Sequence, residues 1–464
     1  MRKDEGLSSD VERLSQLSWM MFLKCLDDHE KNLEGKHYQP IIPKPYRWRD
    51  WAEKEKIDDS ELIEFLKTDL FPKLATLDKN PDNIQQKHVA DIFKGFSNSV
   101  QSPKILRQII EQINKVDFVA TDDIHTLARM YEDMLLEMRN ASGQNGEFYT
   151  PRPVIRFIVN MVKPSLKKGE RVLDPACGTG GFLTESLEFM LNEAKTPSAK
   201  QKLYSETVHG YEKKPLPYLL GMMNLMLHGI EDPNLTRKNT LGSSILELSA
   251  KDEFDVIVTN PPFGGEEESL VAKNLPIGFQ TTDTALAFLY YIMEALKKNG
   301  RCGIILPNGP LFTNGIAAKI KEKLLQEFNL HTIIRLPDSV FAPYTGIATN
   351  ILFFDNTGPT KEIWYYQMKK RQGLKAYSKT KPIQYEDFAD VLKWSENKKK
   401  NQNAWKVSVK EIKDYNLDIK NPNDKEETLE LAPHELIENI LKDEEKTLEL
   451  LREVKELIKR EIPQ

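Results

Sequence analysis

Cysteine is scarce in this sequence: Cys25, Cys177 and Cys302 are the only 3 among 464 residues, and they lie far apart without the spacing of metal ligands. This scarcity excludes a disulfide framework, favours a reducing cytoplasm and offers no metal site. Long apolar runs are also missing, since no stretch approaches the roughly 20 apolar residues of a membrane span. The first ten residues lack an apolar core, so we expect no signal peptide. The sequence predicts a soluble cytoplasmic protein.

A large net charge is missing as well. The chain carries 65 Lys and Arg against 70 Asp and Glu, which gives a formal net charge of -5. This balance provides no overall attraction to nucleic acid or to an anionic membrane. No helix-turn-helix, zinc finger or repeated recognition module can be recognised. Any contact with nucleic acid must therefore come from a local basic patch or from a partner.

The pattern of apolar residues divides the chain into three predicted parts. Residues 1–140 show helical spacing without β-type alternation, which predicts a helical domain. Residues 141–420 contain short β-type runs alternating with helical ones, which is typical of an α/β sheet of the Rossmann type. Residues 421–464 predict an amphipathic helix, suited to packing on a partner helix or on its own domain. Its apolar positions approach a heptad seam: Ile437, Leu441, Leu448, Leu451, Val454 and Ile458.

The middle part allows individual elements to be predicted. Strands are expected at 171–173, 207–211, 254–258, 302–306, 331–336, 350–354 and 363–368. Helices are expected at 153–162, 182–194, 215–229, 283–298 and 316–328. Residues 360–420 otherwise look irregular, and they contain a basic tract, Lys398 to Lys400, between Trp394 and Trp405. The tract suits phosphate contact, and a solvated loop is the alternative.

The stretch FDVIVTNPPF, residues 254–263, predicts a buried strand that stops at a rigid turn. Pro261 and Pro262 cannot donate backbone hydrogen bonds, so the ladder ends there, at the edge where open α/β sheets bind ligands. The Asn260 side-chain oxygen and the Pro261 carbonyl can each accept one N–H of a conjugated amino group. This would bend the nitrogen toward tetrahedral geometry and aim its lone pair at a methyl donor. Phe263 would stack on the flat substrate.

A glycine-rich turn, DPACGTGGF, directly follows the first expected strand, RVL. Glycines there let the backbone approach a ligand and open the next helix. The turn lacks the Gly-Lys-Ser/Thr of a phosphate loop, and Asp174 would repel a pyrophosphate. An acidic residue with small neighbours instead suits a cationic ligand that carries an amino-acid group, such as S-adenosylmethionine. A purely structural glycine turn is the alternative for GTGG in isolation.

Two further segments could complete a cofactor site. Glu212 ends the second expected strand, where an acidic side chain can accept hydrogen bonds from both ribose hydroxyls. The segment GEFYTPR, residues 146–152, precedes the first helix of the sheet domain, and its aromatic pair could form a wall for the methionine end of the cofactor. Taken alone, Glu212 would be a solvated surface residue and GEFYTPR a plain aromatic turn.

The order EFYTP, DPACGTGGF, NPPF resembles that of S-adenosylmethionine-dependent DNA methyltransferases of the N6-adenine type, in the gamma arrangement of motifs. The whole chain resembles the modification (M) subunit of a type I restriction–modification system, through SWMMFLK at 18–24, LPDSVF at 336–341 and TNILFF at 349–354. The resemblance implies that Asn260, Pro261, Pro262 and Phe263 hold an adenine that is flipped out of the duplex. It implies the following cofactor-binding residues: Glu147, Phe148, Tyr149, Thr150, Pro151, Arg152, Asp174, Gly178, Thr179, Gly180, Gly181 and Glu212.

The same resemblance implies partners and leaves alternatives. A specificity (S) subunit would read the DNA sequence, two M subunits would bind each S subunit, and a restriction (R) subunit would complete the enzyme. Methylation of N4 of cytosine is the nearest alternative, although such enzymes more often carry Ser-Pro-Pro-Tyr. An RNA or protein-glutamine methyltransferase and a scaffold without enzymatic activity are more distant alternatives. The helical N-terminal part argues against the first of these, and the intact motifs argue against the second.

Overall fold

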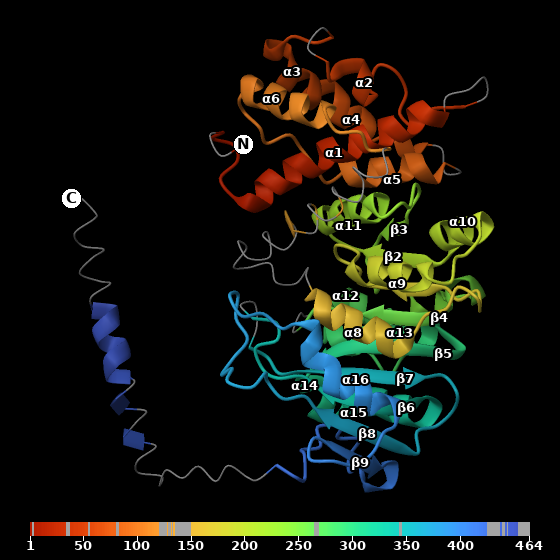
Figure 1. Ribbon diagram of the computed structural model, residues 1–464, viewed down its shortest axis with the longest axis vertical. Helices are drawn as coiled ribbons and strands as arrows, with labels where there is room; N and C mark the ends of the chain where they lie inside the picture. The colour runs from red at the N-terminus through yellow and green to blue at the C-terminus, as the bar shows by residue number, and fades with distance from the viewer. Residues whose placement is uncertain are drawn as a thin grey trace. The chain divides into compact units, whose positions relative to one another are not determined.

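The computed structural model of the chain describes residues 1, 4–33, 38–53, 56–79, 83–119, 128, 131, 133–134, 150–263, 269–342, 346–424, 437–438, 441–442 and 444–452. Contacts within the chain divide it into two units, Met1–Lys420 and Asn421–Gln464 (Figure 1). Within these described ranges, no helix is long and apolar enough to cross a membrane.

The first part of the larger unit is helical, as predicted. Its helices are α1 (Asp10–Leu33), α2 (Trp48–Trp51), α3 (Asp59–Phe65), η1 (Leu66–Leu70), α4 (Phe71–Leu74), η2 (Leu77–Lys79), α5 (Ile84–Phe93) and α6 (Pro103–Asn114). They pack around Trp19, which is fully buried and meets the rings of Phe71 and Phe93 edge to face, at centroid distances of 5.0 and 6.4 Å. Aromatic pairs of this kind add stability beyond the apolar area that they bury.

A sheet of nine strands follows. The strands are β1 (Val172–Asp174), β2 (Val208–Glu212), β3 (Asn234–Arg237), β4 (Phe254–Thr259), β5 (Leu296–Pro307), β6 (Asn329–Arg335), β7 (Thr349–Asp355), β8 (Glu362–Gln367) and β9 (Ala404–Ser408). Their order is β3-β2-β1-β4-β5-β7-β6-β8-β9, and only β7 and β9 run antiparallel to their neighbours. The other seven strands therefore end at one edge of the sheet, where α/β folds bind ligands.

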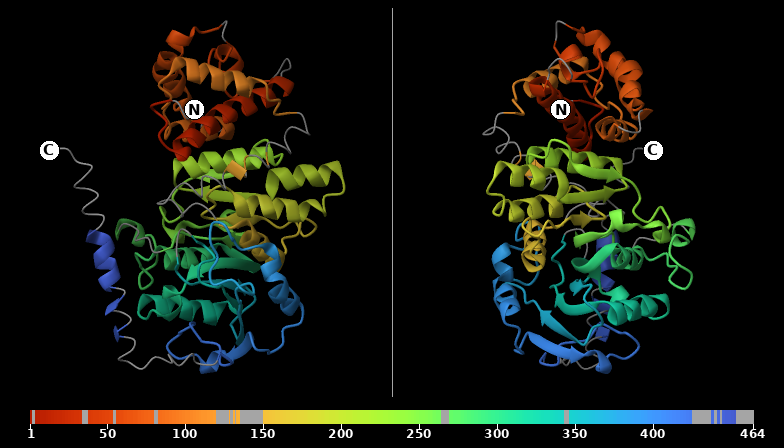
Figure 2. Two further views of the ribbon diagram at one scale, coloured as in Figure 1. Left: turned by 60° about the vertical axis from the view of Figure 1, so that its left-hand side comes forward. Right: turned by 90° about the vertical axis from the view of Figure 1, so that its right-hand side faces the viewer.

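Helices cover both faces of this sheet. One face carries α8 (Arg152–Val162), α9 (Gly181–Leu191), α10 (Pro197–Glu206), α11 (Pro215–Leu227) and α16 (Ala389–Glu396), and the other carries α13 (Thr284–Ala295), α14 (Gly309–Phe312) and α15 (Ile316–Glu327) (Figure 2). Alternate strand residues point to opposite faces, so Val256 and Val258 belong to one apolar cluster and Ile257 to the other. Short helical segments complete the fold: η4 (Ile245–Glu247), η5 (Ala250–Asp252), α12 (Ser269–Ala272), η6 (Tyr385–Phe388) and η7 (Val409–Glu411). This double covering is the predicted Rossmann-type α/β fold, which is confirmed.

The helical part packs directly on the sheet part. Helix α1 contacts α11, and Arg237 at the end of β3 donates a hydrogen bond to the carbonyl of Asp91 in α5. The Tyr131 hydroxyl lies 3.4 Å from the carbonyl of Leu220 in α11. These contacts place the first 119 residues against the side of the sheet that ends in β3.

Every predicted strand is present, but two strands, two longer helices and all the short helical segments of the sheet part were not predicted. Strand β3 has four residues at the edge of the sheet, and only Leu235 among them is buried. Helix α10 and helix α16 were also missed. The prediction that residues 360–420 are otherwise irregular holds for 368–384 and 412–420 but missed α16 and β9. Strand β9 pairs with β8 and stacks Trp405 on Tyr365, with 5.2 Å between ring centroids. The helix expected at 283–298 ends at Ala295, since Leu296 already belongs to β5.

One side chain of the tract Lys398 to Lys400 is bonded to the sheet. The ammonium group of Lys398 donates a hydrogen bond to the Thr332 hydroxyl in β6, and the carbonyl of Lys399 accepts one from the indole of Trp394 at 2.9 Å. Lys398 is half-buried in these contacts, whereas Lys399 and Lys400 are exposed, and the phosphate contact of the tract stays a prediction. These two hydrogen bonds connect the turn that follows α16 to strand β6 and to Trp394 in α16.

The smaller unit is described only in part. Residues 437–438, 441–442 and 444–452 are helical, which agrees with the predicted C-terminal helix. Four of the expected seam positions, Ile437, Leu441, Leu448 and Leu451, are 52 to 60% exposed. Val454 and Ile458 lie outside the described residues. Large aliphatic side chains of the tail are thus exposed at near-heptad spacing.

Candidate functional site

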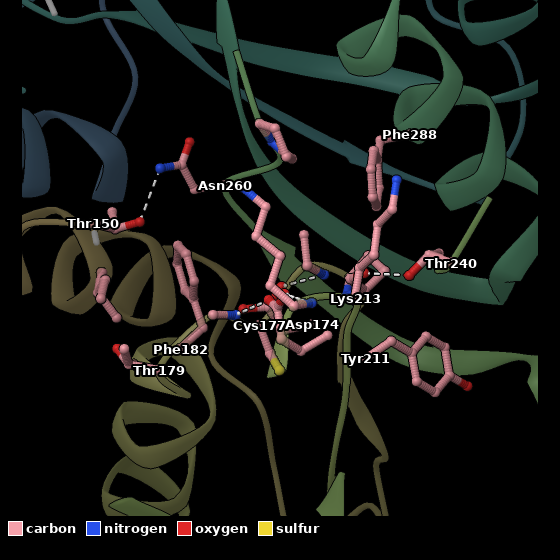
Figure 3. Close-up of a pocket in the computed structure, with 18 of the residues that line it drawn as sticks. Thr150, Asp174, Cys177, Thr179, Phe182, Tyr211, Lys213, Thr240, Asn260 and Phe288 are labelled. Carbon is pink, nitrogen blue, oxygen red and sulfur yellow. Dashed lines mark hydrogen bonds between the residues drawn. The ribbon is translucent and has the colours of Figure 1, made fainter. Parts of the chain in front are cut away.

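A pocket opens at the edge of the sheet where β1, β2, β3 and β4 end (Figure 3). It encloses about 990 Å³ of empty space, including space open to solvent. The residues that line it are Thr150, Arg152, Ile155, Asp174, Pro175, Ala176, Cys177, Gly178, Thr179, Gly181, Phe182, Tyr211, Glu212, Lys213, Lys214, Lys238, Asn239, Thr240, Asn260, Pro262 and Phe288. Residues from three of the predicted motifs therefore meet in one cavity.

The glycine-rich turn forms the floor of the pocket. Gly178 and Gly180 have positive φ angles of 51° and 77°, which side chains disfavour, and Gly180 caps helix α9. A Cβ atom at Gly221 in α11 would lie 3.0 Å from the Gly178 carbonyl oxygen, so the turn and α11 approach closely because both residues lack side chains. The Arg152 guanidinium donates hydrogen bonds to the Gly181 carbonyl at 3.1 Å and to the Thr184 hydroxyl at 2.8 Å, which fastens α8 to the first turn of α9.

Asp174 ends β1 and is 1% exposed. One of its oxygens, Oδ1, accepts hydrogen bonds from the Thr259 hydroxyl at 2.7 Å and from the Ala176 backbone N–H at 3.1 Å. Burial disfavours the charged carboxylate and raises the pKa of Asp174 to about 7, although both hydrogen bonds oppose the shift. The negative charge of Glu212 raises the pKa of Asp174 further. A ligand with positive charge would relieve this unfavourable burial of carboxylates.

Glu212 ends β2 and lies directly beside the glycine turn. Its Oε2 accepts a hydrogen bond from the Gly178 N–H at 3.0 Å, and its Oε1 accepts one from the Lys214 N–H at 2.7 Å. Burial raises the pKa of this carboxyl as well, and the two backbone hydrogen bonds oppose the shift. Because a carboxylate offers about four acceptor sites, Glu212 keeps capacity for hydroxyl groups of a ligand while it holds the turn in place.

Asn260 follows β4 at the rim of the pocket. Its amide nitrogen donates a hydrogen bond to the Thr150 hydroxyl at 2.9 Å, and Figure 3 shows the two side chains facing each other. Its oxygen, Oδ1, is buried and has no hydrogen-bond partner among the residues that the structure describes. An unpaired buried acceptor costs free energy, so a polar atom left in this way at the rim of a cavity points to a ligand that donates a hydrogen bond.

Of the other residues predicted for the site, some line the pocket and others do not. Pro262 lines the pocket, and Pro261 is buried beside it. Phe263 does not line the pocket but packs edge to face on Phe341, with 5.7 Å between ring centroids. Pro151 precedes α8 and is buried. The predicted residues Glu147, Phe148 and Tyr149 lie outside the described residues.

The pocket also contains residues that were not predicted. Lys238, Asn239 and Thr240 follow β3, and the Thr240 hydroxyl donates a hydrogen bond to the carbonyl of Pro175 in the glycine-rich motif. Since all strands in this half of the sheet end at the same edge, recognising β3 would have pointed to these three residues. Phe288 comes from α13 on the other face, and no local sequence signal indicates its role.

This sheet order, with a glycine turn after β1, an acidic residue after β2 and Asn-Pro-Pro-Phe after β4, defines a Rossmann-type methyltransferase. The chain belongs to the N-6 DNA Methylase family, whose model matches residues 122–430, and the HsdM N-terminal domain model matches residues 1–113. Its relatives include the methylase subunit of the type I restriction enzyme EcoEI of Escherichia coli, which is 43% identical over 99% of this chain and 95% of its own length. The predicted resemblance to type I modification subunits is confirmed.

Solved structures agree with this assignment. A modification subunit assigned to a type I restriction enzyme of Vibrio vulnificus YJ016 is 48% identical, covers 91% of this chain and 94% of its own, and superimposes with a TM-score of 0.80. A chain from a study of complex assembly in a type I restriction–modification system is 38% identical, covers 100% of this chain and 96% of its own, and gives a TM-score of 0.84. The relatives thus match the helical part and the sheet part together.

Proposed function

We propose that this chain is the modification subunit of a type I restriction–modification enzyme and transfers a methyl group from S-adenosylmethionine to N6 of adenine in DNA. The observation that carries the proposal is the buried oxygen of Asn260, which has no hydrogen-bond partner among the described residues. It lies in a pocket that is also lined by two buried acidic groups, Asp174 and Glu212. An amino group that donates to Asn260 and a cation beside the two carboxyl groups fit this arrangement.

The residues of the pocket fit S-adenosylmethionine. Glu212 has acceptor sites for two ribose hydroxyls, and the pair of carboxylates favours the positive sulfonium and ammonium groups. The glycine turn lets the backbone approach a ligand without side-chain clashes. When bound, this cofactor supplies an electrophilic methyl group. The segment Glu147 to Tyr149 is proposed to cover its methionine end, with Thr150 continuing that wall.

The residues after β4 would activate the amino group of the base as a nucleophile. Asn260 Oδ1 accepts one N–H and the Pro261 carbonyl accepts the other, which localises the lone pair on nitrogen and aims it into the pocket. The Thr150 hydroxyl holds the Asn260 amide so that its oxygen, and not its nitrogen, faces the base. Phe263 would stack on the flipped adenine while Phe341 supports it from the side.

The assembly of the enzyme is proposed from the same family. A specificity subunit would choose the DNA site, two copies of this chain would bind each specificity subunit, and a restriction subunit would complete the enzyme in the cytoplasm. The exposed aliphatic residues of the tail support a helical partner, since such a seam gains stability when it is buried. In this proposal the chain consists of a helical domain (1–140), a catalytic domain (141–420) and a tail for partner contact (421–464).

The variant Asn260→Ala tests the proposed chemistry. Removing one preorganised polar group from a transition state lowers kcat about 10²- to 10³-fold, while the affinity for S-adenosylmethionine should stay within a few fold. The chain in complex with its specificity subunit would be assayed for methyl transfer to DNA, with calorimetry for the cofactor. Asn192→Ala, at the exposed end of α9, is the matched control. Full activity of the Asn260 variant would refute the mechanism.

The modified base distinguishes the proposal from its nearest alternative. Long-read sequencing of DNA from cells that contain the chain and its specificity subunit should detect N6-methyladenine in a bipartite site. Modified cytosine without methylated adenine would favour the N4-cytosine alternative. The purified chain alone should neither select a DNA site nor methylate it efficiently.

A further inference from the structure

The loop between β8 and α16 is the most basic segment of the catalytic part. Within residues 368–384 it carries six cationic side chains and no acidic one: Lys369, Lys370, Arg371, Lys375, Lys379 and Lys381. The whole chain has a net charge of -5, so this concentration of positive charge runs against the overall balance. We call residues 369–381 the lysine loop. A local cluster of this kind attracts anions where the rest of the surface does not.

Four of the six cations remain available to a partner. Lys370 pairs with Asp338 at 2.6 Å, and Arg371 makes two hydrogen bonds to the Asp387 carboxylate. The other four are exposed and form no ion pair in the described part of the chain: Lys369, Lys375, Lys379 and Lys381. Of the carboxylates that follow the loop, Asp387 is paired with Arg371. Glu386 and Asp390 line a neighbouring pocket together with Lys369, whereas Lys375, Lys379 and Lys381 do not line it.

The lysine loop is held in a fixed conformation. Tyr377 at its centre is 2% exposed, and the Tyr377 N–H donates a hydrogen bond to the Ser339 hydroxyl at 2.9 Å. Ser378 and Lys381 exchange backbone hydrogen bonds at 3.1 and 3.2 Å, which closes the turn that carries the last lysines. Because these contacts order the loop before any ligand binds, binding loses less conformational entropy there.

Contacts connect the lysine loop to the proposed base site. Strand β8 runs parallel to β6 and in the same direction as β4, so the loop leaves the sheet at the edge where Asn260 lies (Figure 1). Ser339 and Asp338, which hold the loop, belong to the segment after β6 that also contains Phe341. Phe341 packs on Phe263 of the Asn-Pro-Pro-Phe turn. The base-binding turn and the lysine loop are thus attached to one segment.

A second cleft lies at the base of the lysine loop. It contains about 790 Å³ of empty space, including space open to solvent. Its one acidic residue, Asp338, is paired with Lys370, and the other polar residues that line it are Asn308, Arg335, Thr349, Asn350, Gln367 and Lys369. The Thr349 residue is 2% exposed, and its hydroxyl has no hydrogen-bond partner among the described residues. Hydroxyl, amide and lysine groups are those that contact phosphate and sugar oxygens in protein–DNA complexes.

We propose that the lysine loop and this second cleft bind the sugar-phosphate backbone of DNA beside the flipped adenine. The proposal rests on the proposed function, because it gives the DNA substrate a place on this chain. Phosphate contacts would position the duplex without reading its sequence, which agrees with a site chosen by another subunit. The lysines neutralise phosphates, and the Thr349 hydroxyl donates to the backbone at the point where the base leaves the stack.

Salt dependence of DNA binding tests this proposal. The triple variant Lys375→Ala, Lys379→Ala, Lys381→Ala is compared with the unmodified chain on a short fluorescein-labelled duplex over a series of salt concentrations. Each lost phosphate contact reduces the slope of log K against log salt by about 0.9, so we expect a reduction of two to three units and binding on the order of 10²-fold weaker near 0.1 M salt. A triple Lys→Arg variant at the same positions should restore the slope.

The matched control removes three exposed lysines from the opposite region of the sheet domain: Lys167→Ala, Lys200→Ala, Lys202→Ala. Lys167 precedes β1, and Lys202 extends to the neighbourhood of Gly169 in the same turn. This control changes the net charge equally, so its slope should equal that of the unmodified chain.

Three results of the binding experiment would overturn the proposal, and one result of an assembly experiment would do the same. These are an unchanged slope in the Lys→Ala triple variant, an equal loss in the control variant, and no binding by the unmodified chain even at low salt. Loss of assembly with the specificity subunit at normal DNA affinity would also overturn it, since it would assign the loop to a protein partner. Affinity for S-adenosylmethionine and the Asn260→Ala result do not depend on these lysines, so failure here leaves the proposed function standing.

Discussion

Burial of Asp174 predicts that the chain loses stability as the pH rises from 5 to 8. Burial raises the pKa of this carboxyl from its ordinary value of 3.8 to about 7. Between those two values the folded protein binds more protons than the unfolded chain, so the free energy of unfolding falls with pH. At about 1.4 kcal/mol per pH unit, the two units from 5 to 7 lower the free energy of unfolding by about 3 kcal/mol. The contribution of Asp174 levels off by about pH 8, where nearly all of the carboxyl is ionised in the folded protein as well.

The variant Asp174→Asn isolates this effect. The amide oxygen that it introduces can still accept from Thr259 and Ala176, but the side chain cannot ionise. Relative to the unmodified chain, the variant should therefore gain about 3 kcal/mol more stability at pH 8 than at pH 5. Urea unfolding of both proteins at each pH, followed by circular dichroism, measures the difference and cancels the other titrating groups. Glu247→Gln, at an exposed carboxylate, is the control and should show no such change.

The same ionisation affects the proposed cofactor. A cation favours the charged carboxylate, so below pH 7 the affinity for S-adenosylmethionine should fall about tenfold per pH unit through protonation of Asp174. Calorimetry at pH 6 and pH 8 measures this dependence, which Asp174→Asn should weaken. A stability difference between the two proteins that is equal at pH 5 and pH 8 would refute the reasoning, because Asp174 would then not titrate in this range.

Three further substitutions test other parts of the structure. Glu212→Gln turns an amide group toward the Gly178 or Lys214 N–H, so calorimetry should show a loss of about 10- to 100-fold in affinity for S-adenosylmethionine; an unchanged value would remove Glu212 from the site. Gly180→Ala has space for a methyl group but a φ of 77°, so thermal unfolding should show a loss of about 1 to 2 kcal/mol, and no loss would contradict the strain argument. Arg237→Ala removes a hydrogen bond between β3 and α5, so hydrogen exchange should become faster in residues 84–93 and not in α15.

Much of the fold could be predicted because its strongest signals are local. The apolar run of β4 stops at two prolines, and the run before the glycine turn stops at Asp174, so each strand and its end can be recognised within ten residues. Parallel strands then have to end at one edge of the sheet. That rule predicts from the sequence that Asp174, Glu212 and Asn260 lie together, and all three line one pocket.

Elements with weak local patterns could not be predicted. Strand β3 is short and half-exposed, and β9 becomes a strand only because β8 offers an edge and Tyr365 offers a ring for Trp405. The residues after β3 were missed with it. Tertiary contacts decide such elements, since their stability comes from partners that are distant in the sequence.

By itself, the sequence determined the class of the protein, the order of its motifs and the residues after β1, β2 and β4, because backbone chemistry and side-chain periodicity act over short distances. Only the tertiary structure decided which polar atoms lack partners. It pairs the Asn260 nitrogen with Thr150 and leaves the oxygen unpaired, and it places Phe263 on Phe341 rather than in the pocket. It also fastens Lys398 to β6 and leaves Lys375, Lys379 and Lys381 exposed. Hydrogen bonding and burial depend on neighbours from the whole chain, and no local pattern specifies them.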